Sequence, residues 1–474
     1  MRFLHQPVLA RLLPALLACW QAGSVCLGTD VADADQADRA RGILADAGVE
    51  GGLVVHVGCA GGRLTAALRG SDSYVVHGLD TQPQAVEQAR RHIGSRGLYG
   101  KVAVDTFDGD RLPYVDNLVN LLVSDDLGAV PMEEVIRVLA PRGVAMIGGT
   151  KTVKPWPDAI DEWTHYLHAA DNNALAEDTV VGPPRHMQWL AGPTWTRHHH
   201  ADKGTYPAIR AVVSSGGRIF YLVDHTKSSN RAVPSRWFLA ARDGFSGLLL
   251  WEKPVQAETF ERRLEQLWRT LIADGGQVYA QLGTGQPLSA LDGATGTVIR
   301  SYQGTEGLQE VIKHKNTLLA VCEQEAILAL RAKTGDRLWQ WEPEDDDPIV
   351  PLTLAASEGK VFVKTETSIH CLSAEGGNTL WRTALEGSEK KIRLKWPREK
   401  LLVADGVVLC SYGGKDPTSL NRDRFQYLGS HPRVHEYAGK LAALSAEDGS
   451  LLWRADYFPG LESTPGEIYV TGGR

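Results

Sequence analysis

The chain has 474 residues, of which 43% are hydrophobic and 23% are charged, and its formal net charge is -7. This length allows two or three domains, and the composition is that of a globular protein rather than a disordered one. The negative net charge argues against a general nucleic-acid-binding protein, because neutralising phosphates requires a concentrated basic surface. We therefore expect no nucleic-acid partner.

Residues 1–28 have the features of a signal peptide. Arg2 and Arg11 precede an apolar run from Leu12 to Trp20, and small residues follow it. The run is too short to span a bilayer, so we expect no transmembrane span beyond this segment. Leu16 to Cys19 also resemble a lipobox, which leaves cleavage, a lipoprotein anchored through the cysteine, and an uncleaved apolar helix as alternatives. The segment predicts export to the periplasm or cell envelope.

Residues 30–150 alternate predicted strands and helices. An apolar strand that begins at Gly52 runs into a glycine-rich turn and a helix, and a second strand from Tyr74 to Leu79 ends on Asp80. This alternation indicates an α/β Rossmann-like domain with a parallel sheet. The later predicted strands are 102–104, 118–123 and 144–147, and the later predicted helices are 83–93 and 132–139.

Residues 53–147 resemble class I S-adenosylmethionine-dependent methyltransferases. The counterparts of the family motifs are Gly58, Gly62, Asp80, Asp108 ahead of Leu112 and Pro113, and RVLAPRG from Arg137 to Gly143. The resemblance implies that S-adenosylmethionine binds with the backbone at Gly58 and Gly62 against its methionine part. It also implies that Asp80 binds the ribose hydroxyls and that Asp108 lies beside the adenine amine.

The match to this family is incomplete, which makes the domain a degenerate methyltransferase-like one. His56 stands where the family has an acidic residue, and Ala60 replaces the middle glycine. Ser124 to Asp126 stand where an NPPY-type motif follows the fourth strand, and residues 151–157 read as a linker where the family continues its sheet. The alternatives are a retained fold without cofactor, cofactor binding without turnover, and methyl transfer.

Residues 205–474 contain a sequence repeat. In each of five copies a short apolar strand follows a glycine or an asparagine, and after it come a second strand and a polar turn that ends in glycine. A tryptophan or an arginine stands four residues after that glycine. Such a unit buries its apolar face only by stacking on its neighbours, so we predict an all-β propeller in which the tryptophan packs between blades. The turns end at Gly247, Gly296, Gly335, Gly377 and Gly449.

This pattern resembles the blades of pyrroloquinoline quinone (PQQ)-type propellers, whose repeat reads roughly A-x-D-x-x-T-G-x-x-x-W. A sixth copy begins at Gly466 and stops inside its first half, so the propeller is predicted to be incomplete and the chain to be part of a longer protein. Arg185 to Trp189 (RHMQW) is a candidate for the strand that closes the ring. Quinoproteins often carry vicinal cysteines and this chain has none, so we do not expect PQQ as a cofactor.

Residues 151–204 form a connector that is rich in tryptophan and histidine. His165 and His168 would share one face of a helix, where Asp161 or Glu162 could complete a metal site. The alternative is that the rings cover the entry face of the propeller and fill the seam between the domains. We expect no metal site, with His165 and His168 as the candidates if one exists.

The whole layout resembles planctomycete-type bacterial proteins in which a methyltransferase-like domain precedes PQQ-like repeats. This resemblance implies the architecture and no particular reaction. With the signal segment, our first hypothesis is an exported protein whose propeller is a binding or assembly platform for a protein or polysaccharide, and the insertion from Tyr412 to Tyr437 is a candidate partner site. Two alternatives remain: an S-adenosylmethionine-dependent methyltransferase that captures its substrate on the propeller, and a PQQ-dependent oxidoreductase.

Overall fold

The computed structural model describes residues 23–474 except 181, 183–186, 194–198, 202–203, 207–208, 229–232, 257–268, 324, 345–346, 386–399, 413–438, 458–467 and 473–474. The signal segment up to residue 22, the insertion at 413–438 and the start of the sixth repeat at Gly466 therefore lie outside the described residues. The chain divides into two compact units, Met1–Lys154 and Pro155–Arg474.

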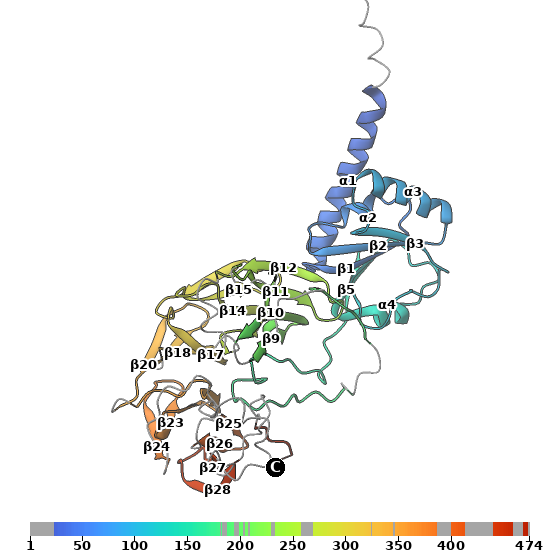
Figure 1. Ribbon diagram of the computed structural model, residues 1–474. Helices are drawn as coiled ribbons and strands as arrows, with labels where there is room; N and C mark the ends of the chain where they lie inside the picture. The colour runs from blue at the N-terminus through green and yellow to red at the C-terminus, as the bar shows by residue number, and fades with distance from the viewer. Residues whose placement is uncertain are drawn as a thin grey trace, which may run out of the picture. The chain divides into compact units, whose positions relative to one another are not determined.

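The N-terminal unit is an α/β domain with one six-stranded sheet in the order β3-β2-β1-β4-β5-β6 (Figure 1). Strands β1 to β5 pair in parallel, and β6 is antiparallel to β5. This confirms the predicted Rossmann-like arrangement. The strands are β1 (Gly52–Val57), β2 (Tyr74–Asp80), β3 (Val102–Thr106), β4 (Val119–Ser124), β5 (Leu139–Ile147) and β6 (Thr150–Val153), and the helices are α1 (Gly23–Ala47), α2 (Arg63–Ala67), α3 (Pro83–Ser95) and α4 (Met132–Val138).

Two elements of this unit differ from the prediction. The residues expected to begin a linker form β6 instead, so the sheet continues past the predicted boundary at residue 150. Gly148 and Gly149 both have positive φ, which permits the tight reversal between β5 and β6. Helix α1 was not predicted, and it begins at Gly23, inside the segment assigned to the signal peptide.

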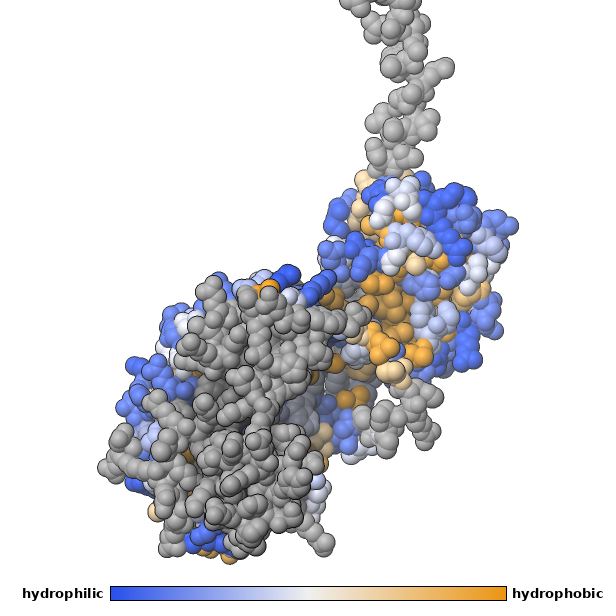
Figure 2. Space-filling view, viewed as in Figure 1, coloured by the Kyte–Doolittle hydropathy of each residue, from blue (hydrophilic) through white to orange (hydrophobic). Residues whose placement is uncertain are grey.

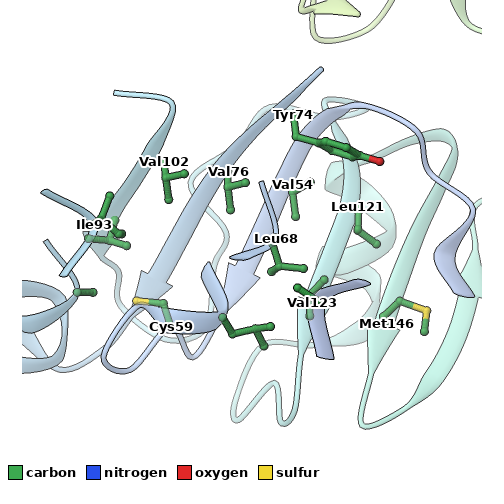
Figure 3. Close-up of a cluster of buried hydrophobic side chains, with 14 of the residues drawn as sticks. Val54, Cys59, Leu68, Tyr74, Val76, Ile93, Val102, Leu121, Val123 and Met146 are labelled. Carbon is green, nitrogen blue, oxygen red and sulfur yellow. The ribbon is translucent and has the colours of Figure 1, made fainter. Parts of the chain in front are cut away.

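Apolar side chains cover both faces of the sheet. On one face, residues of α1, α2 and α3 pack against Val54, Val76 and Leu121 (Figure 3). On the other face, α4 packs against Val55 and Leu122. A parallel sheet that is covered on both sides explains why its strands read as nearly continuous apolar runs. The visible surface of this unit shows hydrophobic residues among hydrophilic ones (Figure 2).

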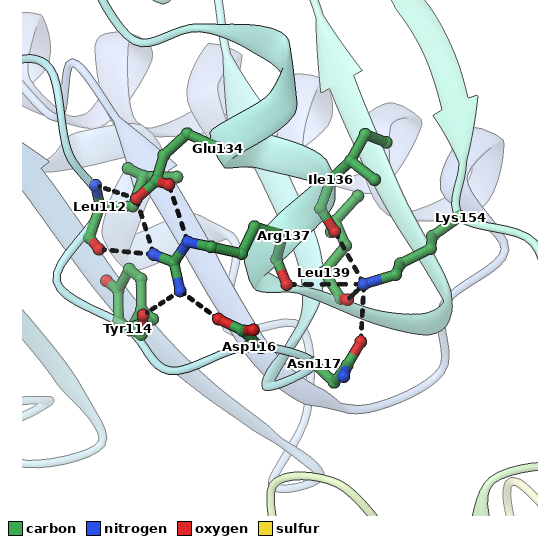
Figure 4. A network of polar contacts seen from close by, with 9 residues as sticks. All are labelled: Leu112, Tyr114, Asp116, Asn117, Glu134, Ile136, Arg137, Leu139 and Lys154. Carbon is green, nitrogen blue, oxygen red and sulfur yellow. Dashed lines mark hydrogen bonds and ion pairs between the residues drawn. The ribbon is translucent and has the colours of Figure 1, made fainter. Parts of the chain in front are cut away.

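A polar network joins the turn at Leu112 to helix α4 (Figure 4). Arg137 donates to the Glu134 carboxylate at 2.6 and 2.7 Å and to the carbonyl oxygen of Tyr114 at 2.9 Å, and it pairs with Asp116 at 2.6 Å. Glu134 in turn accepts from the backbone N–H of Leu112 at 2.9 Å. Two stretches that carried the family resemblance, the Leu112 turn and RVLAPRG, are therefore bonded to each other through Arg137. These bonds fix the turn against helix α4.

The second unit contains five antiparallel four-stranded sheets, each built from consecutive strands, as in the blades of a β-propeller (Figure 1). We number these blades one to five. The first strands of consecutive blades contact one another, so the blades converge on a common axis. The predicted all-β propeller is confirmed.

The strands of blade one are β9 (Ile209–Ser215), β10 (Arg218–Asp224), β11 (Trp237–Asp243) and β12 (Leu249–Pro254), and those of blade two are β13 (Ile272–Asp274), β14 (Gln277–Gln281), β15 (Leu288–Asp292) and β16 (Val298–Tyr302). Blade three has β17 (Leu308–His314), β18 (Thr317–Cys322), β19 (Ala326–Arg331) and β20 (Arg337–Trp341), and blade four has β21 (Ala355–Ser357), β22 (Lys360–Lys364), β23 (Ser368–Ser373) and β24 (Thr379–Ala384). Blade five has β25 (Leu401–Ala404), β26 (Val407–Tyr412), β27 (Gly439–Ser445) and β28 (Leu451–Tyr457), and a separate hairpin pairs β7 (His199–Ala201) with β8 (Gly204–Tyr206).

The tryptophan at the end of a blade packs on the glycine of the next blade's turn, as predicted. The Trp339 indole N–H donates to the carbonyl oxygen of Ala374 at 3.0 Å, and a Cβ on Gly377 would lie 2.5 Å from the Trp339 ring. Only glycine allows this approach together with a φ of 71°. The equivalent pairs are Trp251 with Gly296 and Trp381 with Gly449, whereas Arg300 and Tyr302 take the tryptophan's place against Gly335.

The same contact occurs before blade one. The Trp189 indole N–H donates to the carbonyl oxygen of Gly244 at 3.1 Å, and its ring lies against Gly247. Trp189 therefore takes the position of a preceding blade's tryptophan, although residues 187–190 form no strand and Arg185 lies outside the described residues. At the other end, the Trp453 side chain in blade five is 46% exposed.

We expect Gly377→Ala to destabilise the propeller more than Gly359→Ala in the same blade. Both glycines have positive φ, so each substitution should cost about 1–2 kcal/mol of backbone strain. Only Gly377 is closed off by a tryptophan, which should add about 1–3 kcal/mol of overpacking, whereas a Cβ on Gly359 meets no atom within 4 Å. Guanidinium unfolding of both variants measures the difference, and equal losses would contradict a specific tryptophan–glycine contact.

Candidate functional site

Three of the four predicted cofactor residues gather at the carboxyl edge of the N-terminal sheet. Gly58 directly follows β1, Asp80 ends β2, and Asp108 follows β3. The carbonyl oxygen of Asp80 accepts from the backbone N–H of Phe107 at 3.2 Å, so the loop that carries Asp108 lies against the end of β2. Ligands of open α/β sheets bind at this edge.

The Asp80 carboxylate holds the glycine-rich loop. One oxygen accepts from the backbone N–H of Ala60 at 2.9 Å, and the other accepts from that of Gln82 at 3.0 Å. A carboxylate has about four lone-pair positions, so Asp80 keeps acceptor capacity for a ligand's hydroxyl groups. Its side chain is partly exposed at this edge.

The two predicted glycines have different surroundings. Gly58 is exposed with a φ of 79°, and a Cβ placed on it would meet no atom within 4 Å. A Cβ on Gly62 would lie 2.7 Å from the Ala89 side chain, so this glycine lets α2 pack closely on α3. Open backbone at Gly58 next to the Asp80 carboxylate fits a nucleoside cofactor. Gly62 allows close helix packing, and its contact with a cofactor stays a prediction.

Ala60 and His56, the two residues that depart from the family motif, lie in and just before the glycine-rich turn. Ala60 has a φ of 42°, in the left-handed region that glycine adopts more easily. His56 is buried, and its Nδ1 lies 2.8 Å from the Thr65 hydroxyl oxygen. Burial lowers the pKa of His56 to about 4, so its imidazole is neutral at pH 7. This position therefore brings no charge to the site.

Asp108 is ionised and exposed in a tight turn. Its carboxylate accepts from the backbone N–H groups of Arg111 at 3.1 Å and Asp110 at 3.4 Å. These bonds lower the pKa of Asp108 below its usual value. The proposed contacts of Asp80 and Asp108 with a cofactor remain predictions.

The connector contains a segment, Trp163–Asn173, that runs along the first strands of the propeller. We call it the axial segment. The carbonyl oxygens of Trp163 and Thr164 accept from Ser214 in β9 and Ala273 in β13, and those of Ala170 and Asp171 accept from Ala356 in β21 and Val403 in β25. Its contacts follow blade order, so part of the predicted connector belongs to the propeller unit.

His165 and His168 lie in this segment and do not form the predicted helix. His165 Nε2 accepts from the backbone N–H of Lys313 in β17 at 3.0 Å, and its Nδ1 lies 2.7 Å from the Thr164 hydroxyl oxygen. His168 Nε2 lies 2.7 Å from the Asp161 carboxylate. Both ring nitrogens of His165 are therefore engaged, and the described residues contain no group of three His, Cys, Asp or Glu side chains suited to a metal.

Two asparagines that the sequence reasoning missed anchor the axial segment. Asn172 donates to the carbonyl oxygens of Leu354 and Leu401, each at 2.9 Å. Asn173 both donates to the Val470 carbonyl oxygen at 3.1 Å and accepts from the Val470 backbone N–H at 2.9 Å, which ties Val470 to the axial segment. The sequence signal that could have located this anchor is the pair Asn-Asn after Asp171. Asparagine tolerates a left-handed backbone, and Asn172 has a φ of 65°.

A buried charged cluster lies beside these asparagines. Arg269 donates to the Glu310 carboxylate at 2.7 Å and to the Asn172 side-chain oxygen at 3.1 Å, and its guanidinium lies 5.5 Å from the centre of the Tyr166 ring. The side chains of Arg269 and Glu310 are only 2% and 1% exposed. Removing one partner would leave an uncompensated buried charge. Through its bond to Asn172, Arg269 also links this pair to the axial segment.

Comparisons with known proteins agree with the two-unit structure. A family model described as outer membrane protein assembly factor BamB matches residues 208–343 and 323–456, which together exceed half of the chain. The chain belongs to this BamB-type repeat family. A model of a methyltransferase domain matches residues 54–143, so a methyltransferase-type domain precedes the BamB-type propeller, as predicted. No curated protein gives a significant match.

Solved structures similar to parts of this chain include two propeller proteins and one methyltransferase. BamB from Moraxella catarrhalis is 16% identical, with a TM-score of 0.34, over 53% of this chain and 63% of its own. A quinohemoprotein alcohol dehydrogenase from Pseudomonas putida HK5 is 13% identical (TM-score 0.36; 52% of each chain), and a SAM-dependent methyltransferase from Aquifex aeolicus is 25% identical (TM-score 0.22; 23% and 62%). The chain thus spans less than two thirds of each of these proteins.

No helix among the described residues of this BamB-type repeat protein has the length and apolar character needed to cross a membrane.

Acid should destabilise the BamB-type propeller through His165. Burial lowers the pKa of His165 from 6.5 to about 3, so between these values the unfolded chain binds a proton that the folded chain does not. The contribution of neutral His165 to the free energy of unfolding is therefore fully present above pH 6.5. It is lost as the pH falls below 6.5, by about 1.4 kcal/mol per pH unit at most. His165→Gln cannot take up this proton.

Urea unfolding of the wild type and His165→Gln between pH 7 and pH 4.5 measures this contribution. The variant should be less stable at pH 7, and its deficit should shrink as the pH falls. A constant deficit across this range would show that His165 is not the titrating group.

Proposed function

We propose that this is an exported protein whose N-terminal unit binds S-adenosylmethionine or S-adenosylhomocysteine and whose propeller is a platform for a protein or polysaccharide. The observation that carries the cofactor proposal is the pairing of an open backbone at Gly58 with the Asp80 carboxylate beside it. Asp80 would bind the ribose hydroxyls, and Asp108 would lie beside the adenine.

The axial segment supports a platform rather than a quinone enzyme. Propeller blades surround a central channel, and here the first strands of blades one to five bond to the chain's own residues 163–171. A quinone in that channel would have to displace this segment. The surface loops then remain as the place where a partner would bind.

Calorimetric titration with S-adenosylmethionine and S-adenosylhomocysteine tests the cofactor proposal. We expect micromolar dissociation constants for the wild type. Asp80→Asn should weaken binding about 10- to 100-fold, because a hydrogen bond to a charged group contributes about 1.5–3 kcal/mol.

Asp105→Asn is the matched control, because Asp105 stands near the end of the adjacent strand β3 and pairs with Arg90 rather than with the glycine-rich loop. It should bind like the wild type. Thermal unfolding of each variant verifies that the N-terminal unit is intact. No heat of binding with folded wild-type protein would retire the cofactor proposal.

Export can be tested separately by fractionating bacteria that produce the full chain. We expect a shortened chain in the periplasmic or envelope fraction, because residues 12–20 supply the apolar core of a signal peptide. Replacing both Leu16 and Leu17 by aspartate should leave the full-length chain in the cytoplasm. Cys19→Ala distinguishes lipidation from simple cleavage, and a wild-type chain that stays in the cytoplasm at full length would refute export.

A further inference from the structure

The N-terminal sheet has one topological switch point, between β1 and β4. The strand order runs β1, β2, β3 to one side and β4, β5 to the other, so the connections after β1 and β4 leave in opposite directions. Ligands of such sheets bind outside the carboxyl ends of the strands at this point. Val57 pairs with Ser124 in the last pair of the register, so the chain leaves the sheet at this point in both strands, through Gly58 and through Asp125.

An ion pair occupies this switch point. The Arg39 guanidinium of helix α1 donates to the carboxylate of Asp125, and their side chains are 42% and 72% exposed. An exposed ion pair contributes little to stability, so a ligand that supplies both charges can replace it at little cost. The pair is thus well suited to exchange.

Both charges are held by anchored elements. The Ser124 hydroxyl donates to the carbonyl oxygens of Val57 at 3.0 Å and Asp126 at 2.8 Å, which orders the turn that carries Asp125. On α1, Asp33 pairs with Arg63 at 3.1 Å and with Arg96 at 2.8 Å. Neither Arg39 nor Asp125 depends on a long mobile loop for its place.

The buried neighbour of the switch point brings no charge of its own. His56 is neutral and engaged with Thr65, and the charged groups that act on it electrostatically are Asp125, Arg39 and Asp80. Asp80 is already bonded to the glycine-rich loop. Of these three charged groups, Asp80 is the proposed partner of the ribose hydroxyls, so Arg39 and Asp125 remain for another part of the ligand.

We infer that Arg39 and Asp125 bind the α-amino-acid end of the ligand, Arg39 taking the carboxylate and Asp125 taking the ammonium group. This inference rests on the proposed cofactor function and deepens it, since it assigns the end of the ligand opposite the nucleoside. A guanidinium binds a carboxylate through two parallel N–H···O bonds, which gives direction as well as charge. The ligand class is a nucleoside joined to a zwitterionic amino acid.

The test compares two ligands that differ in this end alone. S-adenosylhomocysteine carries the amino-acid group, and 5′-methylthioadenosine lacks it. Arg39→Gln and Asp125→Asn should each weaken S-adenosylhomocysteine binding about tenfold or more and leave 5′-methylthioadenosine binding unchanged. Arg39→Lys keeps the charge but loses the paired geometry, so it should fall between Arg39→Gln and the wild type.

Arg41→Gln is the matched control, because Arg41 lies on the same helix but pairs with Asp38 of that helix. It should alter neither affinity. Thermal unfolding verifies that each variant keeps its fold.

The outcomes separate this inference from the proposed function. If both ligands bind and neither variant changes the preference for S-adenosylhomocysteine, the inference is wrong and the cofactor proposal stands. If Arg39→Gln strengthens S-adenosylhomocysteine binding, the ion pair blocks the site rather than recognising the ligand, which also overturns the inference. If the wild type binds neither ligand, both proposals fail.

Discussion

The first strand of every propeller blade has an inner edge whose backbone N–H groups need hydrogen-bond acceptors, and in this protein one segment supplies them. Unpaired backbone groups at a buried edge are costly, and an exposed edge invites wrong pairing. The axial segment gives one hydrogen-bond acceptor to the first strand of each of blades one to five. The donors run from the backbone N–H of Ser214 in blade one to that of Val403 in blade five. The placement of the blades around the axis therefore depends on residues that precede the propeller in sequence.

The contacts between blades add a second, repeated constraint. The rings of Trp251, Trp339 and Trp381 lie within 2.7 Å of where a Cβ on the next blade's turn would be, so shape and hydrogen bonding select the same pair of residues. The inner contacts come from backbone carbonyls of the axial segment and from side chains such as His165 and Asn172, whereas the contacts at the turns come from a repeated motif. The propeller thus combines a regular outer interface with a specific axis.

In the N-terminal unit, the polar groups divide between support and recognition. Arg137 and Glu134 hold the turn at Leu112 by short, partly buried bonds, which suits a structural role. Arg39 and Asp125 are exposed at the switch point, where a ligand can reach them. The same sheet therefore places a fixed network and an exchangeable pair at different edges.

The parallel strands, the five blades and the tryptophan–glycine contacts were predictable because each follows from a local pattern, such as the apolar run before Gly58 or the glycine that ends a turn. Helix α1 and strand β6 were not. Apolar residues of α1 such as Ala40 and Leu44 are buried or half-buried only because they belong to one core with residues of α2 and α3. Strand β6 forms because it hydrogen-bonds to the edge of β5.

The sequence by itself determined the two modules and the positions of Gly58 and Asp80 at strand ends, because strand periodicity and turn residues act over short distances. The tertiary structure alone decided that Gly62 serves packing, that His165 accepts a backbone N–H, and that Arg39 meets Asp125. Arg39 and Asp125 are 86 residues apart. Such contacts depend on how helices and strands pack in space, which no local pattern encodes.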